Sequence, residues 1–391
     1  MAQRLNTKAK LKSLFAVTSS AVALFGGISL YQGHEKFYSE IAIPLVQQLN
    51  PETAHNLAVK ALQWGFVPKQ EMEDSSLLRT TAWGLQFKNP IGMAAGFDKQ
   101  GEAVEGLHKI GFSFVEIGSV TPKPQSGNPK PRVFRLPEDN AVINRYGFNS
   151  DGHDVVWQRL KKLKENKNFN GILGVNLGRN KETEDPAQDY IDGIKKFVDT
   201  ADYFVINVSS PNTPGLRSLQ SKKNLVELLT RINAARESVG SKQPLLLKLA
   251  PDLSDAERQD VADVILNKKT RVDGLILCNT TITRPNLINP NKKESGGLSG
   301  APLNDISTAM ISDMYRRTRG RIPIIGVGGV FSAADAYDKI KAGASLVQVY
   351  TSYIYNGPPI VGKIKKELCE ILKTNGFSSV TDAIGKDTKI R

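Results

Sequence analysis

Short apolar runs that end in glycine or in a polar residue recur along the chain. Most of them are separated by segments long enough for a helix, such as Lys222–Ser238 and Asp255–Leu266. The eight runs are Ile91–Gly96, Phe114–Thr121, Ile172–Gly178, Tyr203–Ser210, Leu245–Pro251, Gly274–Thr280, Ile324–Gly329 and Leu346–Tyr353. Near-continuous apolar strands that alternate with helices are typical of a parallel sheet covered on both faces. The pattern therefore predicts an α/β fold.

Two architectures fit eight such units: a closed (β/α)8 TIM barrel and an open doubly wound sheet. Eight units are a natural number for closure, which favours the barrel. The active site of such a barrel lies at the carboxyl ends of its strands, where the polar residues of this chain fall. In addition, Ser75–Asn89 predicts a hairpin that closes the barrel bottom, Ala141–Gly147 an extra strand, and the polar segment Thr374–Arg391 a frayed tail.

The amino-terminal segment differs from the rest of the chain. Residues 1–12 are basic, no acid occurs before Glu35, and Ser13–Tyr31 contains no charge. As a helix, Ser13–Tyr31 would span about 28 Å, close to the thickness of a hydrocarbon core. The segment fits a cleaved secretory signal or an uncleaved anchor behind a mitochondrial-type leader, and the acid-free leader favours the anchor. Because positive charges stay on the matrix side, the following domain would face the intermembrane space from a single-pass anchor in the inner membrane.

Residues 37–66 predict a pair of short amphipathic helices. Asn50 resembles an N-cap and Pro51 a first helical residue. The apolar positions are Phe37, Ile41, Ile43, Leu45, Val46 and Leu49 in the first helix, and Ala54, Leu57, Ala58, Ala61 and Leu62 in the second. Such a pair forms either an interfacial platform on a membrane or a lid that packs on the barrel, and the pattern leaves both open. Residues 77–391 would then form the barrel domain.

Composition excludes several functional classes. The chain is 40% hydrophobic and 23% charged, with a net charge of +13. Lys and Arg are scattered among acids and no basic motif is interleaved with aromatics, so we expect no nucleic-acid partner; a lipid surface explains the charge better. The only two cysteines, Cys278 and Cys369, form no disulfide framework, and no Cys/His spacing indicates a metal site. Nothing indicates an obligate protein partner.

The segment Tyr203–Gly215 carries the densest candidate chemistry. Its apolar strand delivers uncharged hydrogen-bonding groups to one point, on a loop that two prolines stiffen. No Asp, Glu or Lys occurs between Asp202 and Arg217, so this cluster suits a polar planar ligand better than a metal.

Three further features suit a flat anionic ligand. Ala94–Lys99 places small residues where a backbone can approach such a ligand, with Lys99 at the mouth, although Gly-x-Asp-Lys is a weak signal. Ile324–Gly329 ends strand seven in glycines, which favours phosphate binding over simple tight turns. Lys248 lies inside an apolar strand and requires a negative ligand or a structural partner.

Asparagines recur at the predicted strand ends. A single one is usually a turn residue, but several that converge can bind a heterocycle with amide or imide edges. The five are Asn144, Asn176, Asn207, Asn212 and Asn279. All four histidines, His34, His55, His108 and His153, lie outside the predicted strand ends. A histidine base is therefore not expected, and Ser210 is the best candidate for proton transfer.

With these motifs in view, the chain resembles the class 2 dihydroorotate dehydrogenases, the membrane-associated, quinone-dependent, mitochondrial-type enzymes of pyrimidine biosynthesis. The resemblance extends from Phe37 to Cys369, and a serine at Ser210 marks class 2. The matching motifs are Asn89–Lys99, Glu116–Pro122, Pro131–Leu136, Ile143–Asn149, Asn207–Pro214 and Gly296–Gly300. One departure is visible: Cys278 stands where the family usually has threonine, and a contact through its backbone carbonyl would be unaffected.

The resemblance implies one FMN and one dihydroorotate in the barrel mouth. The expected FMN-binding residues are Ala95, Gly96, Lys99, Ser119, Asn144, Asn176, Asn207, Lys248, Cys278, Gly300, Gly328, Gly329, Tyr350 and Thr351. The expected dihydroorotate-binding residues are Lys99, Asn144, Arg145, Tyr146, Gly147, Phe148, Asn207, Asn212, Asn279 and Thr280.

The resemblance also implies the chemistry. Ser210 would remove a proton from C5 of dihydroorotate while a hydride passes from C6 to the flavin, and Thr213 with a water near Phe148 would relay the proton. Lys248 would stabilise the charge of the reduced ring. Ubiquinone would then enter between the amphipathic helices and meet His55, Arg135 and Tyr350.

Two other functions remain open from the sequence. One is a different FMN-dependent barrel oxidoreductase, such as a 2-hydroxyacid oxidase, which would be expected to carry a histidine at a strand end, or a dihydropyrimidine-type reductase. The other is a membrane-tethered barrel that binds a phosphate-bearing ligand without redox chemistry.

Overall fold

A closed barrel of eight parallel strands forms the body of the protein. The computed structural model describes residues 7–68 and 73–390. Around the barrel the strand order is β10-β12-β13-β3-β4-β7-β8-β9, with each neighbouring pair parallel. Each barrel strand falls within one of the eight predicted runs or overlaps it. The predicted (β/α)8 barrel is confirmed, and the open doubly wound sheet is wrong.

The elements have the following bounds. The strands are β1 Thr80–Ala82, β2 Leu85–Phe87, β3 Ile91–Met93, β4 Phe114–Val120, β5 Val133–Leu136, β6 Ala141–Asn144, β7 Ile172–Leu177, β8 Tyr203–Asn207, β9 Leu245–Leu249, β10 Gly274–Leu277, β11 Gly297–Gly300, β12 Ile324–Val327 and β13 Ala344–Val349. The helices are α1 Thr7–Gln32, α2 Glu35–Phe37, α3 Ile43–Gln47, α4 Pro51–Gln63, α5 Val104–Ile110, α6 His153–Glu165, α7 Pro186–Phe197, α8 Lys222–Ser238, α9 Asp255–Leu266, α10 Asn304–Arg317, α11 Ala333–Ala342, α12 Thr351–Asn356 and α13 Pro359–Thr374.

Strand alternation sorts the apolar side chains into two layers. On β8, Tyr203 and Val205 belong to the cluster inside the barrel, whereas Phe204 and Ile206 belong to the cluster under the outer helices. Because successive side chains point to opposite faces, the next inward position after Val205 is Asn207. The barrel interior is therefore apolar at the bottom and becomes polar toward the carboxyl ends of the strands.

The predicted hairpin closes the bottom of the barrel. Strands β1 and β2 pair antiparallel, and the Trp83 indole between them donates to the Asp273 carbonyl at 2.7 Å. Phe87 packs edge to face on Phe114 with ring centroids 5.4 Å apart. At the opposite end, β5, β6 and β11 form a small antiparallel sheet. The sequence predicted only β6 of these three strands.

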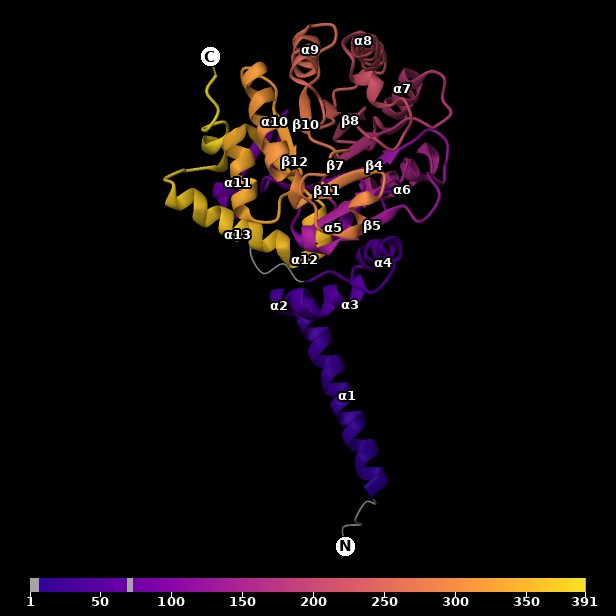
Figure 1. Ribbon diagram of the computed structural model, residues 1–391, viewed down its shortest axis with the longest axis vertical. Helices are drawn as coiled ribbons and strands as arrows, with labels where there is room; N and C mark the ends of the chain where they lie inside the picture. The colour runs from indigo at the N-terminus through magenta and orange to yellow at the C-terminus, as the bar shows by residue number, and fades with distance from the viewer. Residues whose placement is uncertain (1–6, 69–72, 391) are drawn as a thin grey trace.

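Only the first of the amino-terminal helices stands apart from the barrel. Figure 1 shows α1 extending away from the body of the protein, with α2, α3 and α4 between α1 and the barrel. Helix α1 is apolar and long enough to cross a membrane, and nearly all of its side chains are exposed. Residues 1–6 of the expected leader, including Arg4, lie outside the described residues, whereas Thr7–Lys12 already belong to α1.

The predicted helix pair is present. A π-helical turn at Tyr38–Ala42 joins α2 to α3, and the Asn50 side chain caps α4 by accepting from the backbone N–H groups of Glu52 and Thr53. Glu52 then docks α4 onto the barrel through a bidentate pair with Arg132, at 2.7 and 3.1 Å. The small sheet and α4 together frame the barrel mouth.

The prediction of a frayed carboxyl terminus is wrong for the described part of that segment. After α13, residues Val380–Ala383 form a 3₁₀ turn in which Val380 and Ala383 are fully buried. The backbone N–H of Asp387 donates to Lys341 in α11 at 3.0 Å. Buried apolar side chains at two positions hold this polar segment on the barrel.

Candidate active site

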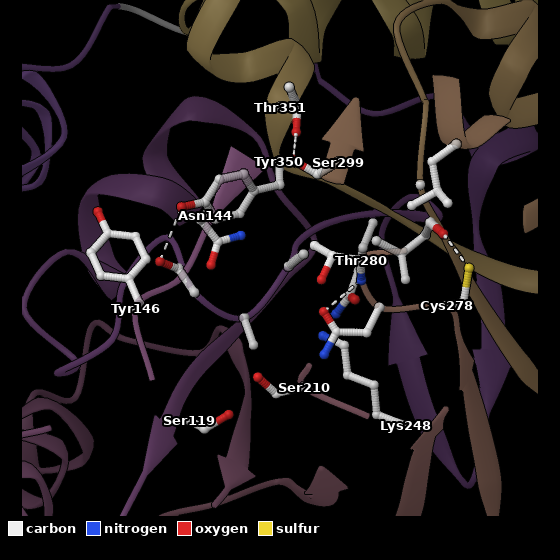
Figure 2. A pocket seen from close by; sticks show the side chains of 18 of the residues that line it. Ser119, Asn144, Tyr146, Ser210, Lys248, Cys278, Thr280, Ser299, Tyr350 and Thr351 are labelled. Atoms are coloured by element: carbon white, nitrogen blue, oxygen red, sulfur yellow. Dashed lines mark hydrogen bonds between the residues drawn. The ribbon is translucent and has the colours of Figure 1, made fainter. Parts of the chain in front are cut away.

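A polar cavity opens at the carboxyl ends of the barrel strands, beneath the small sheet. Figure 2 shows its side chains around one space, with Tyr350, Ser299 and Thr351 on one side and Ser119, Ser210 and Lys248 on the other. The predicted site residues that line it are Ala95, Gly96, Lys99, Ser119, Asn144, Tyr146, Gly147, Phe148, Asn207, Ser210, Asn212, Lys248, Cys278, Asn279, Thr280, Gly300, Gly328, Gly329, Tyr350 and Thr351.

Three predicted residues do not line the cavity. Arg145 extends away from it, donates to Glu294 at 2.6 Å and lies over the Phe134 ring, so its side chain is not placed to bind a ligand there. Asn176 is fully buried beneath the cavity. Thr213 is also buried, and its Oγ1 has no hydrogen-bond partner.

The loop after β8 positions Ser210. The Asn207 Oδ1 accepts from the backbone N–H of Ser209 at 3.2 Å and from its hydroxyl at 2.7 Å, which fixes the first turn of the loop. The Ser210 Oγ accepts from the Asn212 backbone N–H at 3.3 Å, and the residue is 7% exposed. The Asn212 side chain bridges to Asn144 on β6, at 3.1 Å to its carbonyl. Ser210 therefore faces the cavity from a loop braced on both sides.

Glycines form the end of the cavity near β12 and β11. Gly329 has φ +71°, and a Cβ there would lie 2.5 Å from the backbone of Asn304. Gly300 has φ +106°, and its Cβ would lie 2.3 Å from the Asn140 carbonyl oxygen. Ser352, which also lines the cavity, has a buried hydroxyl without a partner. At both positions the positive φ and the lack of space for a Cβ require glycine. Glycines that line the cavity beside an unpaired hydroxyl fit a phosphate group.

The charges of the cavity favour an anionic ligand. Lys99 and Lys248 line it, and no carboxylate is among its lining residues in the described chain. The Lys99 ammonium donates to the Gly96 carbonyl and lies 4.1 Å from the centroid of the Tyr146 ring. Burial, assisted by the nearby Arg132, lowers the pKa of Lys99 to about 8. A cation held in this way gains from a bound anion.

Cys278 fills the position where the family resemblance expects threonine. Its thiol lies 4.0 Å from the Val327 carbonyl on β12, and burial raises its pKa to about 12. The side chain is therefore a neutral group directed at the neighbouring strand.

A second, apolar cavity of about 610 Å³ lies between the amino-terminal helices and the barrel. The predicted residues His55, Arg135 and Tyr350 all line it. Burial, with a smaller contribution from Lys99, lowers the pKa of His55 to about 3, so its ring is neutral at physiological pH. The Arg135 guanidinium donates to the carbonyls of Gln47 and Leu49 at 2.7 and 3.0 Å, which ties it to α3.

The two cavities share part of their walls. Asn144, Tyr146, Ser299 and Tyr350 line both of them. The Tyr350 hydroxyl donates to the Gly96 carbonyl at 3.2 Å, and burial raises its pKa, so the phenol stays protonated. A flat group bound in the polar cavity would therefore lie next to the apolar one.

Two residues of this region, Gln348 and Glu116, were not predicted, although each is a polar residue within an apolar strand, as Lys248 is. Gln348 lines the cavity from within β13, and Glu116 lies on β4 beneath Lys248, with its carboxylate 3.4 Å from the ammonium. Both are polar residues inside apolar strands, so the same rule could have identified them. Ser299 lies on the unpredicted strand β11 and had no such signal. Among the described residues, no group of His, Cys, Asp and Glu is arranged to hold a metal ion.

Comparison with known proteins identifies the family of the chain. Residues 77–372 match the family model described as dihydroorotate dehydrogenase. The mitochondrial dihydroorotate dehydrogenase (quinone) of Mus musculus is 50% identical over 94% of this chain and 96% of its own length. The dihydroorotate dehydrogenase (quinone) of Rhodospirillum rubrum is 49% identical over 89% of this chain and 94% of its own length.

Solved structures agree with the sequence matches. A crystal structure of the enzyme from Eimeria tenella in complex with ferulenol has a TM-score of 0.84 and 45% sequence identity, and the match covers 88% of this chain and 98% of that one. The barrel, the polar cavity at its mouth and these matches lead to one conclusion. This chain belongs to the dihydroorotate dehydrogenase family, in its quinone-dependent class 2.

Proposed function

We propose that this protein oxidises dihydroorotate to orotate in pyrimidine biosynthesis, with FMN in the polar cavity and ubiquinone as the electron acceptor. Its membership of the quinone-dependent family supports the reaction. The observation that carries the assignment of the two substrates is the shared wall between a polar, cationic cavity and an apolar one. A flavin bound at that wall would contact a polar electron donor in the first cavity and an apolar electron acceptor in the second.

The residues present fit FMN. Its phosphate fits the backbone cradle of Gly300, Gly328 and Gly329 with Thr351, and its ring fits the small residues Ala95 and Gly96. The amides of Asn144 and Asn207, the hydroxyl of Ser119 and the ammonium of Lys248 would meet its polar edges. When bound, FMN supplies a two-electron acceptor that can pass its electrons on to a quinone.

The polar mouth would hold dihydroorotate. Lys99 offers a cation to its carboxylate, and Asn144, Asn207, Asn212 and Asn279 offer amide donors and acceptors to its ring edges. The Asn279 amide is oriented by donating to the Ser209 hydroxyl at 3.0 Å. Together with Thr280 and the segment Asn144–Phe148, these groups would fix the substrate with C5 toward Ser210.

Ser210 would then accept the C5 proton. A serine hydroxyl is a poor base alone, so it requires a route that removes its own proton. Thr213 is suited to such a relay because its buried Oγ1 has no hydrogen-bond partner. Phe148 lines the cavity at φ +54° and would shield this route from bulk water.

The apolar cavity would admit the quinone. His55 presents a neutral imidazole, and Arg135 a guanidinium tethered to α3, to the carbonyl oxygens of the head group. Ala54, Leu57, Ala58 and Ala61 line the cavity from α4. This supports the interpretation of residues 37–66 as a platform that delivers quinone from the bilayer.

We further propose a location in the mitochondrial inner membrane. The apolar helix α1 is long enough to span a bilayer, and the basic residues of this region, Arg4, Lys8, Lys10 and Lys12, all lie at its amino-terminal end or before it. The relatives from Mus musculus and Arabidopsis thaliana are named mitochondrial. With basic residues on the matrix side, the barrel would face the intermembrane space. In mitoplasts, added protease should then digest the barrel.

Spectra and turnover of the full-length protein in detergent test the function. The purified protein should be yellow, and its visible absorption should bleach when dihydroorotate is added without oxygen. A ubiquinone analogue should then restore the colour. A colourless protein would refute the assignment of FMN, and a coloured one that dihydroorotate does not bleach would refute the substrate.

A further inference from the structure

A ring of polar residues occupies the inward positions directly below the proposed flavin site. Glu116 lies on β4, Asn176 on β7, Lys248 on β9 and Gln348 on β13. Residues two positions earlier on three of these strands, Phe114, Leu246 and Leu346, belong to the apolar cluster inside the barrel. Strand alternation therefore turns these polar side chains inward as well.

Glu116 is the only carboxylate of this ring, and it contacts the other three residues. It is 0% exposed. One oxygen accepts from the Asn176 amide at 2.8 Å and lies 3.4 Å from the Lys248 ammonium, and the other accepts from the Gln348 amide at 2.7 Å. A single side chain thus ties together three strands that are far apart along the sequence.

The carboxylate fixes the direction of a chain of hydrogen bonds. Because the Glu116 oxygens accept, the Asn176 NH₂ must face them, which leaves the Asn176 Oδ1 to accept from the Ser119 hydroxyl. The Ser119 oxygen in turn accepts from the Asn207 NH₂ at 2.8 Å. Both Ser119 and Asn207 line the polar cavity. Glu116 therefore determines which atoms of these side chains a ligand can meet.

Glu116 also offsets the charge of Lys248. Their side chains are 0% and 5% exposed, so water screens this pair little. Lys248 lines the cavity where the flavin ring is proposed to lie, and it would favour negative charge on that ring. A carboxylate behind the ammonium reduces this effect.

We propose that Glu116 is a positioning residue that sets the reduction potential of the bound flavin, by offsetting Lys248 and by orienting Asn176, Ser119 and Asn207. The inference rests on the proposed function, because it requires FMN in the polar cavity. A reduced flavin carries more negative charge than an oxidised one. Removing the Glu116 charge should therefore favour reduction and raise the potential, and removing the Lys248 charge should lower it.

The test is the midpoint potential of the bound flavin, measured in detergent against a reference dye of known potential. Glu116→Gln should shift the potential upward and Lys248→Met downward. The double variant, whose buried pair is again neutral, should return toward the wild-type value. Glu105→Gln removes an exposed carboxylate that pairs with Lys109 on α5, and it should leave the potential unchanged.

The outcomes separate this inference from a merely structural role. Glu116→Gln with full flavin content and a wild-type potential would overturn it, even if the variant melted at a lower temperature. If Glu116→Gln does not fold, the comparison of Lys248→Met with the double variant decides, because the double variant leaves no unpaired buried charge. Equal potentials in those two proteins would also overturn it. A wild-type protein without flavin would instead refute the proposed function.

Discussion

The titration of Lys99 leads to a prediction about substrate capture. The Lys99 ammonium lines the polar cavity, donates to the Gly96 carbonyl and lies over the Tyr146 ring. Burial and the nearby Arg132 lower its pKa to about 8. In the proposed function this ammonium binds the carboxylate of dihydroorotate. Because burial disfavours the charged form, the proton is lost as the pH rises through about 8, and the attraction for the substrate anion is lost with it.

The size of the effect follows from that pKa. With a pKa of about 8, about nine tenths of Lys99 is protonated at about pH 7 and about one tenth at about pH 9. The value of kcat/KM for dihydroorotate should therefore fall about tenfold over this interval, since kcat/KM reports groups of the free enzyme. The assay is the initial rate of dye reduction at limiting dihydroorotate, from about pH 6.5 to about pH 9.5.

Lys99→Arg provides the matched comparison. A guanidinium remains protonated throughout this range, so the variant should lose the fall above about pH 8 even if its overall rate is lower. Lys109→Arg, which changes a side chain 56% exposed on α5, should keep the wild-type profile. A wild-type profile that is flat to about pH 9.5, or the same fall in Lys99→Arg, would refute the reasoning.

Other predictions concern the base, the quinone route and the docking of α4. Ser210→Ala should retain FMN but slow flavin reduction by about 10²–10⁴-fold in rapid mixing, and near-normal bleaching would end the assignment of Ser210 as base. Deleting residues 1–33 should spare reduction of a short-chain quinone, whereas deleting residues 1–67 should abolish it and spare dye reduction; full quinone activity in the longer deletion would make the helix pair only a lid. Glu52→Gln should lower stability by about 3–5 kcal/mol in thermal unfolding, because it leaves the buried Arg132 without a counter-charge. Despite its burial, ion pairing with Arg132 and Lys130 holds the pKa of Glu52 below its usual 4.5. The stability that this ion pair contributes should therefore be complete at neutral pH and lost in acid. An unchanged melting temperature of Glu52→Gln at neutral pH would contradict this prediction.

The sequence was sufficient for the barrel because its strands are buried on both faces. Such strands appear as uninterrupted apolar runs, and the predicted helices Lys222–Ser238 and Asp255–Leu266 match α8 and α9. The end of the eighth barrel strand was predicted less accurately. The sequence predicted that it ends at Tyr353, whereas β13 ends at Val349 and α12 already begins at Thr351. A buried helix and a buried strand have similar apolar composition, so the boundary between them leaves a weak signal.

The small sheet was only partly predictable. Strand β6 contains an apolar run, Ala141–Ile143, whereas β11 is Gly-Leu-Ser-Gly and carries almost no strand signal. It forms because β6 pairs with β11 on one side and with β5 on the other. The partial burial of Ser299 on β11, its hydrogen bond from Thr351 and its place in both cavities depend on that tertiary pairing.

The candidate site was predictable where residue type alone indicates chemistry. Asparagines, glycines and a lysine at strand ends were identified because each is unusual in an apolar context, and most of them line the polar cavity. The direction of the Arg145 side chain could not be predicted, because its partner Glu294 is 149 residues away in the chain. The role of the Glu116 carboxylate could not be predicted, because it depends on Asn176 and Gln348, which are 60 and 232 residues away in the chain.

The two cavities also explain why the substrates need not compete for one entrance. An anionic substrate would have to lose its hydration to pass the apolar cavity. The one cation among the described lining residues, Arg135, already donates to the carbonyls of Gln47 and Leu49. A quinone with an apolar tail gains nothing from the polar mouth, where lysines and asparagines favour water or an anion. The helices that form the apolar cavity adjoin α1, the helix long enough to span a bilayer. Under the proposed function, polarity alone would direct each substrate to its own side of the wall that contains Asn144 and Tyr350.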